Sequence, residues 1–132
     1  NSVDNSCFSN FIKVILIYPV PKMPLDLKKS LMRYPIKGLH KIINTEKIKE
    51  YAFVDFKDFI EDYSEIFKIY DQIEGKNIER VYPHILTCNY NEEKCYGASD
   101  NELYYWDDNH LIQRYNENVA LKILNKFKFN NK

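Results

Sequence analysis

The amino-acid sequence predicts an α/β protein with a parallel sheet. Three observations support this prediction: a nearly continuous apolar stretch at residues 11–18, an amphipathic helical pattern at 54–74, and a second helical pattern at 111–127. Because strand-like and helical segments alternate along the chain, we expect parallel strands joined by right-handed crossovers. At 132 residues, the chain is long enough for one domain with a core and too short for two ordinary domains.

The first strand is predicted at residues 11–18, and Pro19 and Pro21 end it. Its run of β-branched and apolar residues is typical of a strand that is buried on both faces in a parallel sheet. Two short helices are expected to follow, at residues 25–34 and 39–49.

The clearest helix is predicted at residues 54–74, and Gly75 is expected to end it as the C′ residue. Apolar side chains recur in it at three- and four-residue spacing, with charged residues between them. We expect this stripe to cover one face of the sheet rather than to form a ligand groove. The stripe consists of Phe56, Phe59, Ile60, Tyr63, Ile66, Phe67, Tyr70 and Ile73.

The C-terminal part is predicted to contain two more strands and a last helix. Residues 80–86 form the first of these strands, which is broken or entered at Pro83. Residues 103–106 form a short aromatic strand, and the last helix runs from 111 to 127.

Composition excludes several classes of function. Lys plus Arg and Asp plus Glu number 19 each, so no net charge favours nucleic acid or an anionic membrane. The longest apolar run, residues 14–21, contains two prolines and falls far short of the ~20 residues of a membrane-spanning helix. The histidines and cysteines lack metal-site spacing, so we expect neither a metal nor a cofactor; His84 is expected to be a packed or hydrogen-bonded strand residue and His40 a surface residue.

The strongest chemical signal is the pair Asp107 and His110, between the aromatic segment and the last helix. A histidine that acts as a general base needs a carboxylate that fixes its tautomer and stabilises the imidazolium. Residues three apart face the same side of a tight turn, so Asp107 can do both. In open α/β sheets, reactive residues gather beyond the carboxyl ends of strands, where this pair is expected. The alternative is a solvated helix start with Asp107 or Asp108 as N-cap.

A nucleophile for this pair is missing from the sequence. None of the serines follows a strand in a Gly-Asp-Ser or Gly-x-Ser-x-Gly setting. Ser99 lies closest to the pair in sequence, but residues 97–101 are typical of a turn. The pattern therefore indicates the base half of a hydrolase or acyl-transfer site without its attacking half. The serines are Ser2, Ser6, Ser9, Ser30, Ser64 and Ser99.

Cys88 and Cys95 enclose a short polar loop that a disulfide could close. A bridge across so short a loop would stabilise the fold by roughly 2–3 kcal/mol. Composition alone is equally compatible with two free thiols, and Cys7 remains as an odd third cysteine.

Together, these features resemble the C-terminal half of an SGNH (GDSL-type) hydrolase domain, in the version fused to membrane acyltransferase-3 proteins. The resemblance covers residues 11–127. It rests on the strand that ends in Tyr18-Pro19, the long helix, the paired cysteines, the block from Leu103 to Leu111 with its Asp-x-x-His, and the terminal helix.

The resemblance implies a flavodoxin-like α/β/α sandwich, of which this chain would be a part, with Asp107 orienting His110 as general base. It implies an extracytoplasmic or luminal location, attached to a membrane domain in the parent protein. Disulfides persist in such oxidising compartments, which favours a Cys88–Cys95 bridge. The implied activity is acyl-ester hydrolysis or O-acyl transfer from an acyl donor to a sugar or other alcohol.

The chain also departs from the family pattern. The Gly-Asp-Ser, glycine and Gly-x-Asn-Asp blocks should precede the strand at Val14 and are absent, and residues 112–116 replace the usual small residue and glycine after the histidine. We therefore expect residues 1–10 to be a disordered or remnant segment and residues 11–132 to be the C-terminal part of an SGNH-like domain, inactive alone. The alternative is a degenerate SGNH-like module that binds or scaffolds, with a vestigial site.

Overall fold

A computed structural model describes residues 13–32 and 48–127 of the chain. At its centre lies a parallel pair of strands, β1 (Val14–Ile17) and β3 (Ile78–Val81), in which Val14 is opposite Ile78 and Ile17 is opposite Val81. The amides of Val14 and Tyr18 extend the pairing by hydrogen bonds to the carbonyls of Asn77 and Val81, each 2.9 Å long. The predicted α/β class with a parallel sheet is therefore confirmed.

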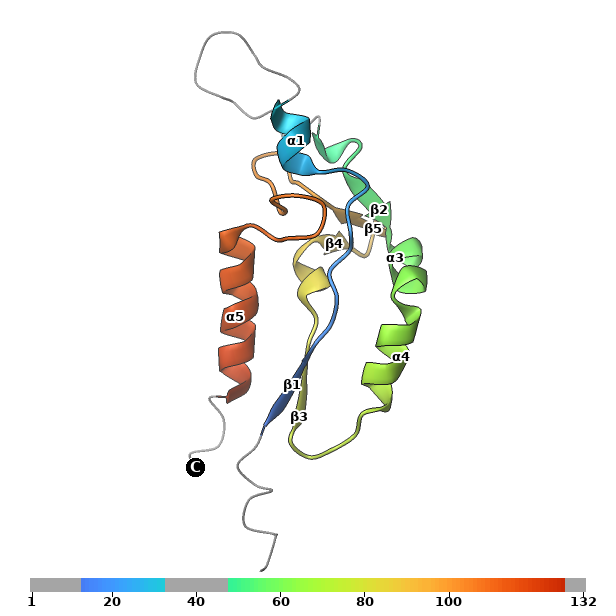
Figure 1. The fold of residues 1–132 in the computed structure, drawn as a ribbon, viewed down its shortest axis with the longest axis vertical. Coiled ribbons are helices and arrows are strands. Elements are labelled where there is room, and N and C mark those ends of the chain that lie inside the picture. Colours follow the sequence, from blue (N-terminus) through green and yellow to red (C-terminus); the bar gives the residue numbers. More distant parts are fainter. Residues whose placement is uncertain (1–12, 33–47, 128–132) are drawn as a thin grey trace, which may run out of the picture.

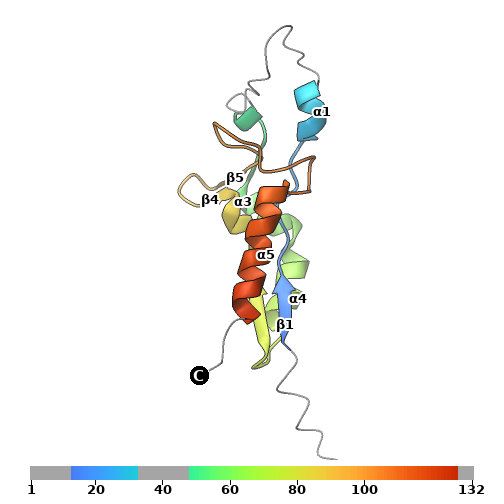
Figure 2. The ribbon, with the colours of Figure 1, turned by 90° about the vertical axis from the view of Figure 1, so that its left-hand side faces the viewer.

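Helices cover the two faces of this pair. Helix α4 (Ser64–Gln72) lies on one side, and α5 (Gln113–Phe127) lies on the other (Figure 1). After a quarter turn of the view, α5 lies in front of the two strands (Figure 2). The layers helix, sheet and helix are those expected of part of an α/β/α sandwich.

The prediction that the first strand is buried on both faces is wrong. Val14 and Ile17 are 43% and 46% exposed. In the described ranges β1 has a strand neighbour only along its β3 edge, so these side chains lack the flanking contacts that a strand on the other edge would supply. An apolar strand reaches full burial only when further strands and helices surround it.

The helix predicted at 54–74 is divided. Its first residues belong to β2 (Phe53–Asp55), followed by α3 (Phe56–Asp62) and α4, with the break at Tyr63. Gly75 is not the C′ residue, because α4 already ends at Gln72. The Arg80 Nη2 group instead donates to the carbonyl oxygens of Tyr70 (3.1 Å) and Ile73 (2.7 Å), which satisfies the end of the helix.

The aromatic stripe covers the sheet around Tyr18, which is almost fully buried. The Tyr18 ring lies 4.4 Å from that of Tyr82 and 5.1 Å from that of Phe67, centroid to centroid. Its hydroxyl donates to Asp71 and accepts a 3.2 Å hydrogen bond from Arg80 Nε. Burial and the Asp71 hydrogen bond raise the pKa of Tyr18 to about 12. The stripe thus packs as predicted along one row, whereas a second row remains exposed: Ile66, Ile69 and Ile73.

A second sheet was not predicted. Strand β5 (Lys94–Tyr96) pairs antiparallel with β2 on one side and with β4 (Cys88–Asn89) on the other. These strands have two or three residues each, too few for periodicity to reveal.

Three other boundaries differ from the predictions. The strand predicted at 80–86 ends at Val81, because Pro83 starts the 3-10 turn η1 (Pro83–Leu86). Residues 103–106 form isolated bridges, Ala98 to Leu103 and Tyr105 to Leu111, instead of a strand. The helix at 25–34 is present as α1 (Leu27–Met32).

Two predicted segments lie outside the described residues: residues 1–10, and all but the last two residues of the helix at 39–49. Within the described ranges, no helix has both the length and the apolar character needed to cross a bilayer. The main core cluster lies at the α1 end of the molecule and joins Met23, Leu27, Ile48, Ala52, Ala98, Tyr105, Leu111 and Tyr115.

Candidate active site

The loop that carries Asp107 and His110 is closed by the core beneath it. Tyr105 and Leu111, the residues that flank the loop, are buried and form a bridge to each other. The Trp106 amide donates to the His110 carbonyl, with 2.7 Å between nitrogen and oxygen. Residues 106–110 therefore form a tight loop whose two ends are fixed by packing.

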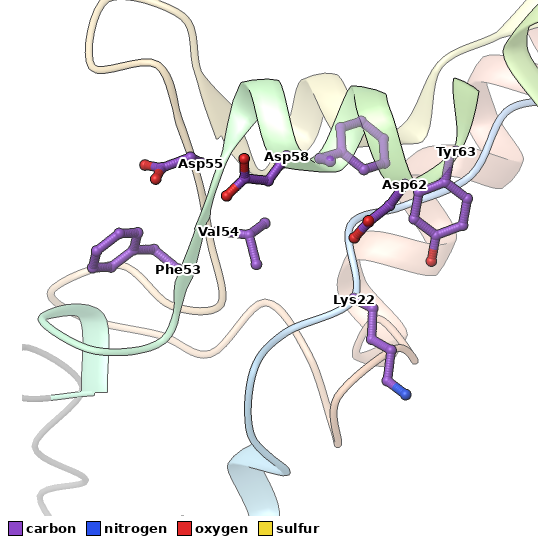
Figure 3. Close-up of a pocket in the computed structure, with 8 residues that line it drawn as sticks. Lys22, Phe53, Val54, Asp55, Asp58, Asp62 and Tyr63 are labelled. Carbon is purple, nitrogen blue, oxygen red and sulfur yellow. The ribbon is translucent and has the colours of Figure 1, made fainter.

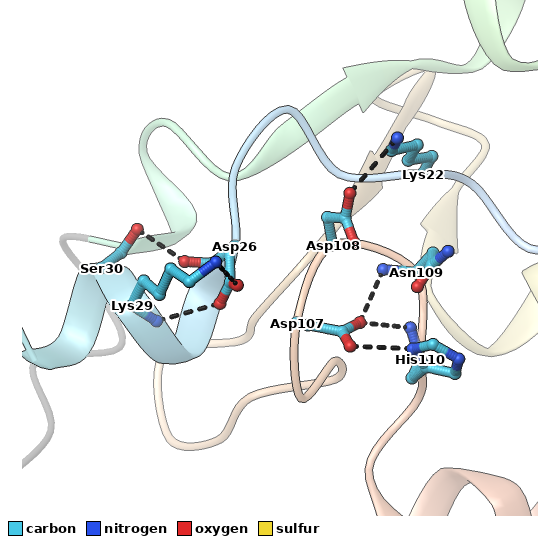
Figure 4. Close-up of polar contacts among 8 residues, drawn as sticks. All are labelled: Lys22, Asp26, Lys29, Ser30, Asp107, Asp108, Asn109 and His110. Atoms are coloured by element: carbon cyan, nitrogen blue, oxygen red, sulfur yellow. Dashed lines mark hydrogen bonds and ion pairs between the residues drawn. The ribbon is translucent and has the colours of Figure 1, made fainter.

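Within this loop, Asp107 and His110 are in direct contact (Figure 4). The Asp107 Oδ2 atom lies 2.8 Å from His110 Nδ1. The other carboxylate oxygen, Oδ1, accepts hydrogen bonds from the backbone amides of Asn109 (2.9 Å) and His110 (2.8 Å). The same carboxylate thus holds the turn and the imidazole ring, as in an Asx turn.

These contacts define the charge and the tautomer of the pair. The amide of Asn109, the amide of His110 and then the imidazole lower the pKa of Asp107 to about 2, so it is a carboxylate near neutral pH. A carboxylate accepts only, so Nδ1 of His110 carries a proton, and in the neutral ring the lone pair is on Nε2. The His110 side chain is 74% exposed, whereas that of Asp107 is 28% exposed.

Asp108 is neither a helix cap nor a free solvated neighbour. Its Oδ2 atom lies 3.3 Å from Lys22 Nζ (Figure 4). Its carbonyl accepts a 2.6 Å hydrogen bond from the Met23 amide. Asp108 therefore ties the loop to the segment after β1, a contact that sequence spacing could not reveal because 86 residues separate the partners.

A groove with a volume of about 270 Å³ opens beside His110. Apolar side chains from β1, from the segment after it and from α5 form most of its wall, and His110 and two asparagines lie at its edge. The lining residues are Ile17, Tyr18, Val20, Pro83, Asn109, His110, Leu111, Asn116 and Val119.

No serine in the described ranges hydrogen-bonds His110. Ser99 is held in a turn, where its hydroxyl oxygen accepts the amides of Asn101 (3.3 Å) and Glu102 (3.2 Å). The Ser30 hydroxyl donates to the Asp26 carbonyl, and Ser64 is the first residue of α4. Ser2, Ser6 and Ser9 lie outside the described residues.

The two cysteines of the hairpin are joined. Cys88 and Cys95 form a disulfide with an S–S distance of 2.01 Å, and they are directly opposite each other in the β4–β5 pairing. Cys7 and His40 lie outside the described residues. His84 is buried, but in the η1 turn rather than in a strand. Within the described ranges, no three His, Cys, Asp or Glu side chains form a metal-binding group.

A second groove, of about 280 Å³, lies between Lys22 and helix α3 (Figure 3). Its wall carries the carboxylates of Asp55, Asp58 and Asp62 together with the ring of Tyr63. The predicted helix at residues 54–74 merges part of β2 with α3, and a single helix does not indicate this groove. Its lining contains neither histidine nor serine, the base and the nucleophile of the predicted site.

A comparison with protein families identifies the type of domain. A family model described as "SGNH domain (fused to AT3 domains)" matches residues 8–122, which is most of the chain. No curated protein and no solved structure matches the chain in the corresponding searches.

Proposed function

This chain belongs to the family of SGNH domains that are fused to AT3 domains, and we propose that it carries the aspartate–histidine half of a serine acyl-transfer site. The observation that supports this is the 2.8 Å contact between Asp107 Oδ2 and His110 Nδ1, which leaves Nε2 on the far side of the ring. Family membership makes the domain type SGNH hydrolase or acyltransferase, and the residue roles are our proposal.

In the complete site, His110 Nε2 takes the hydroxyl proton of a serine while the serine Oγ attacks the carbonyl carbon of the acyl donor. The imidazolium, stabilised by the Asp107 carboxylate, then returns the proton to the departing alkoxide, which leaves an acyl-serine. A sugar hydroxyl, another alcohol or water attacks that ester, and His110 takes and returns the proton again. Asp107 can stabilise the imidazolium throughout because its own pKa lies near 2.

We propose that the serine and the oxyanion-hole donors come from a part of the domain outside this chain, so that residues 11–132 are its C-terminal part. Three features support this. In the described ranges, no serine hydrogen-bonds His110, and β1 is paired along one edge only. Apolar side chains are exposed along that strand and along α5: Val14, Ile17, Leu121, Leu124 and Phe127.

Without the serine and the oxyanion hole, the chain alone is expected to be inactive. Each oxyanion-hole donor lowers the barrier by roughly 3–4 kcal/mol, and an isolated base cannot replace the nucleophile. We further propose that the parent polypeptide contains a membrane acyltransferase domain and that the site faces an extracytoplasmic or luminal compartment. The Cys88–Cys95 disulfide supports this location.

The exposure of His110 favours a second candidate function. An imidazole that is 74% exposed, with no nucleophile hydrogen-bonded to it in the described ranges, is also what a vestigial site would show. In that case the chain is a degenerate SGNH-like binding or scaffold module, and Asp107 and His110 are dispensable.

The test begins with the coding sequence upstream of Asn1. If a Gly-Asp-Ser block is present in frame, the whole reading frame is expressed and assayed with p-nitrophenyl acetate. We expect His110→Gln and Asp107→Asn each to lower kcat/KM by roughly 10³-fold or more, because the members of such a site act as a unit. Asp108→Asn is the matched control, and a change of less than about threefold is expected because its exposed ion pair is weak.

Two results would contradict the proposal in different ways. Hydrolysis by residues 1–132 alone that Ser99→Ala abolishes would show that the chain contains its own nucleophile. Full activity of the His110→Gln variant in the complete reading frame would remove His110 from the mechanism and leave the scaffold function.

A further inference from the structure

His84 fills the place where α3 and α4 meet the end of β3. Its side chain is 5% exposed, and it belongs to the η1 turn that follows the strand. Aromatic rings from three elements surround it, at centroid distances of 5.3 Å to Phe59, 5.9 Å to Tyr82, 6.0 Å to Phe67 and 6.2 Å to Phe56. The imidazole is therefore part of the contact between the two helices and the turn.

Only one of the two imidazole nitrogens has a hydrogen-bond partner. The ring bonds to the backbone of Pro19, and because proline has no N–H, the carbonyl oxygen must accept. Nδ1 is buried without a partner. The neutral ring fits this site, with its single N–H on Pro19 and its lone pair on Nδ1. An imidazolium would add an N–H at Nδ1 for which this site has no described acceptor, and a full positive charge for which it has no described counter-charge.

No charged side chain compensates for a proton on His84. In the described part of the chain, none of the ion pairs includes this residue, and of the rings that contact it only that of Tyr82 is ionisable. On β3, Arg80 is engaged with the Tyr18 hydroxyl, as is Asp71 on α4. The other charged side chains of α3 and α4 are exposed. Burial lowers the pKa of His84, against a smaller opposing effect of the Pro19 carbonyl.

We propose that His84 is a pH-dependent switch. The neutral ring packs α3 and α4 against the η1 turn, and protonation of the ring releases both helices from that turn. The helices are suited to release because Phe59 is the only buried residue of α3 and α4 has none. Segments with few buried contacts open at lower free energy than the rest of a domain. Pro83, next to His84, lines the groove beside His110, so release also reshapes that groove.

Amide hydrogen exchange of the full 132-residue chain between pH 7.5 and 4.5 tests this proposal. Rates are normalised for intrinsic exchange at each pH, and the His84 ring is titrated by NMR in the same samples. If the open state takes up one proton that the closed state excludes, protection falls about tenfold per pH unit below about pH 6.5. We expect this loss in the amides of α3 and α4, and unchanged protection in α5.

Two matched variants complete the test. His84→Gln removes the proton site, and its α3 and α4 protection should no longer depend on pH beyond intrinsic exchange. His110→Gln makes the same change at an exposed histidine, and the wild-type dependence should remain. The proposal is overturned if His84→Gln loses protection as steeply as the wild type. If that variant does not fold, the wild type decides: protonation of His84 without loss of protection, or protection of α3 and α4 that does not change with pH below about pH 6.5, overturns the proposal.

Discussion

The hydroxyl of Tyr18, the residue that follows β1, joins helix α4 to strand β3. It donates to Asp71 on α4 and accepts from Arg80 Nε on β3, while its ring is packed beneath Phe67 and Tyr82. Tyr18→Phe removes this oxygen and keeps the ring, so the variant isolates the two hydrogen bonds from the packing.

The expected loss of stability follows from those two bonds. A hydrogen bond to a charged partner contributes about 1.5–3 kcal/mol, but the Asp71 residue is exposed and regains water when the hydroxyl is lost. Arg80 keeps its bonds to the carbonyls of Tyr70 and Ile73. We therefore expect Tyr18→Phe to lower the free energy of unfolding by about 2 kcal/mol, which is about 7 °C in Tm for a chain of 132 residues.

Thermal and guanidinium unfolding of the two proteins measure this change. Tyr90→Phe is the matched control, because the Tyr90 ring is half-exposed and makes an edge contact with Phe56 but no described hydrogen bond; a loss below about 0.5 kcal/mol is expected. Equal stability of Tyr18→Phe and wild type would refute the reasoning.

The pH dependence gives a second readout of the same residue. The folded pKa of Tyr18, about 12, lies above the ordinary tyrosine value of 10.0, so its contribution to stability is complete below pH 10 and is lost as the pH rises toward 12. Wild type should therefore lose stability between pH 10 and 12 more steeply than Tyr18→Phe.

Three further predictions concern the rest of the fold. Replacing both Cys88 and Cys95 by serine should lower the free energy of unfolding by about 2–3 kcal/mol, and reductant should destabilise the wild type but not this variant in thermal unfolding. Gly97→Ala should lower the free energy of unfolding by about 1–3 kcal/mol in a guanidinium titration, because the new Cβ would lie 3.0 Å from Leu27 Cδ1. An unchanged midpoint would show that the neighbouring side chains move to accommodate the methyl group. The pKa of Asp107 is lowered from 3.8 to about 2, so the stability that this residue contributes is present above pH 3.8 and is lost toward pH 2. The turn at residues 107–110 should therefore lose amide protection between pH 3.8 and 2. The Asp107→Asn variant should lack this pH dependence.

The sequence predicted those elements whose formation depends on residues close to one another along the chain. The β-branched run before Pro19 forms β1, and the apolar periodicity after Leu111 forms α5. In each case the controlling residues lie within a few positions of one another, which is the range that periodicity and spacing can report.

The errors have a common cause in contacts between distant segments. Residues Phe53–Asp55 match the helical pattern that follows them, but they pair with Lys94–Tyr96, about forty positions away. Likewise, the composition of β1 predicts burial on both faces, whereas burial of Val14 and Ile17 depends on neighbours that the described ranges do not supply. A single sequence carries no direct signal for either contact.

The same division between local and distant contacts determines how the candidate site must be tested. The contact between Asp107 and His110 is made within one short loop, closed by the packing of Tyr105 and Leu111. This geometry can therefore form whether or not a nucleophile is present, and it is the same in an active and in a vestigial site. A serine, in contrast, must reach Nε2 from a distant segment. Only an experiment that supplies the remaining part of the domain, and then removes His110 from the complete protein, can distinguish the two functions.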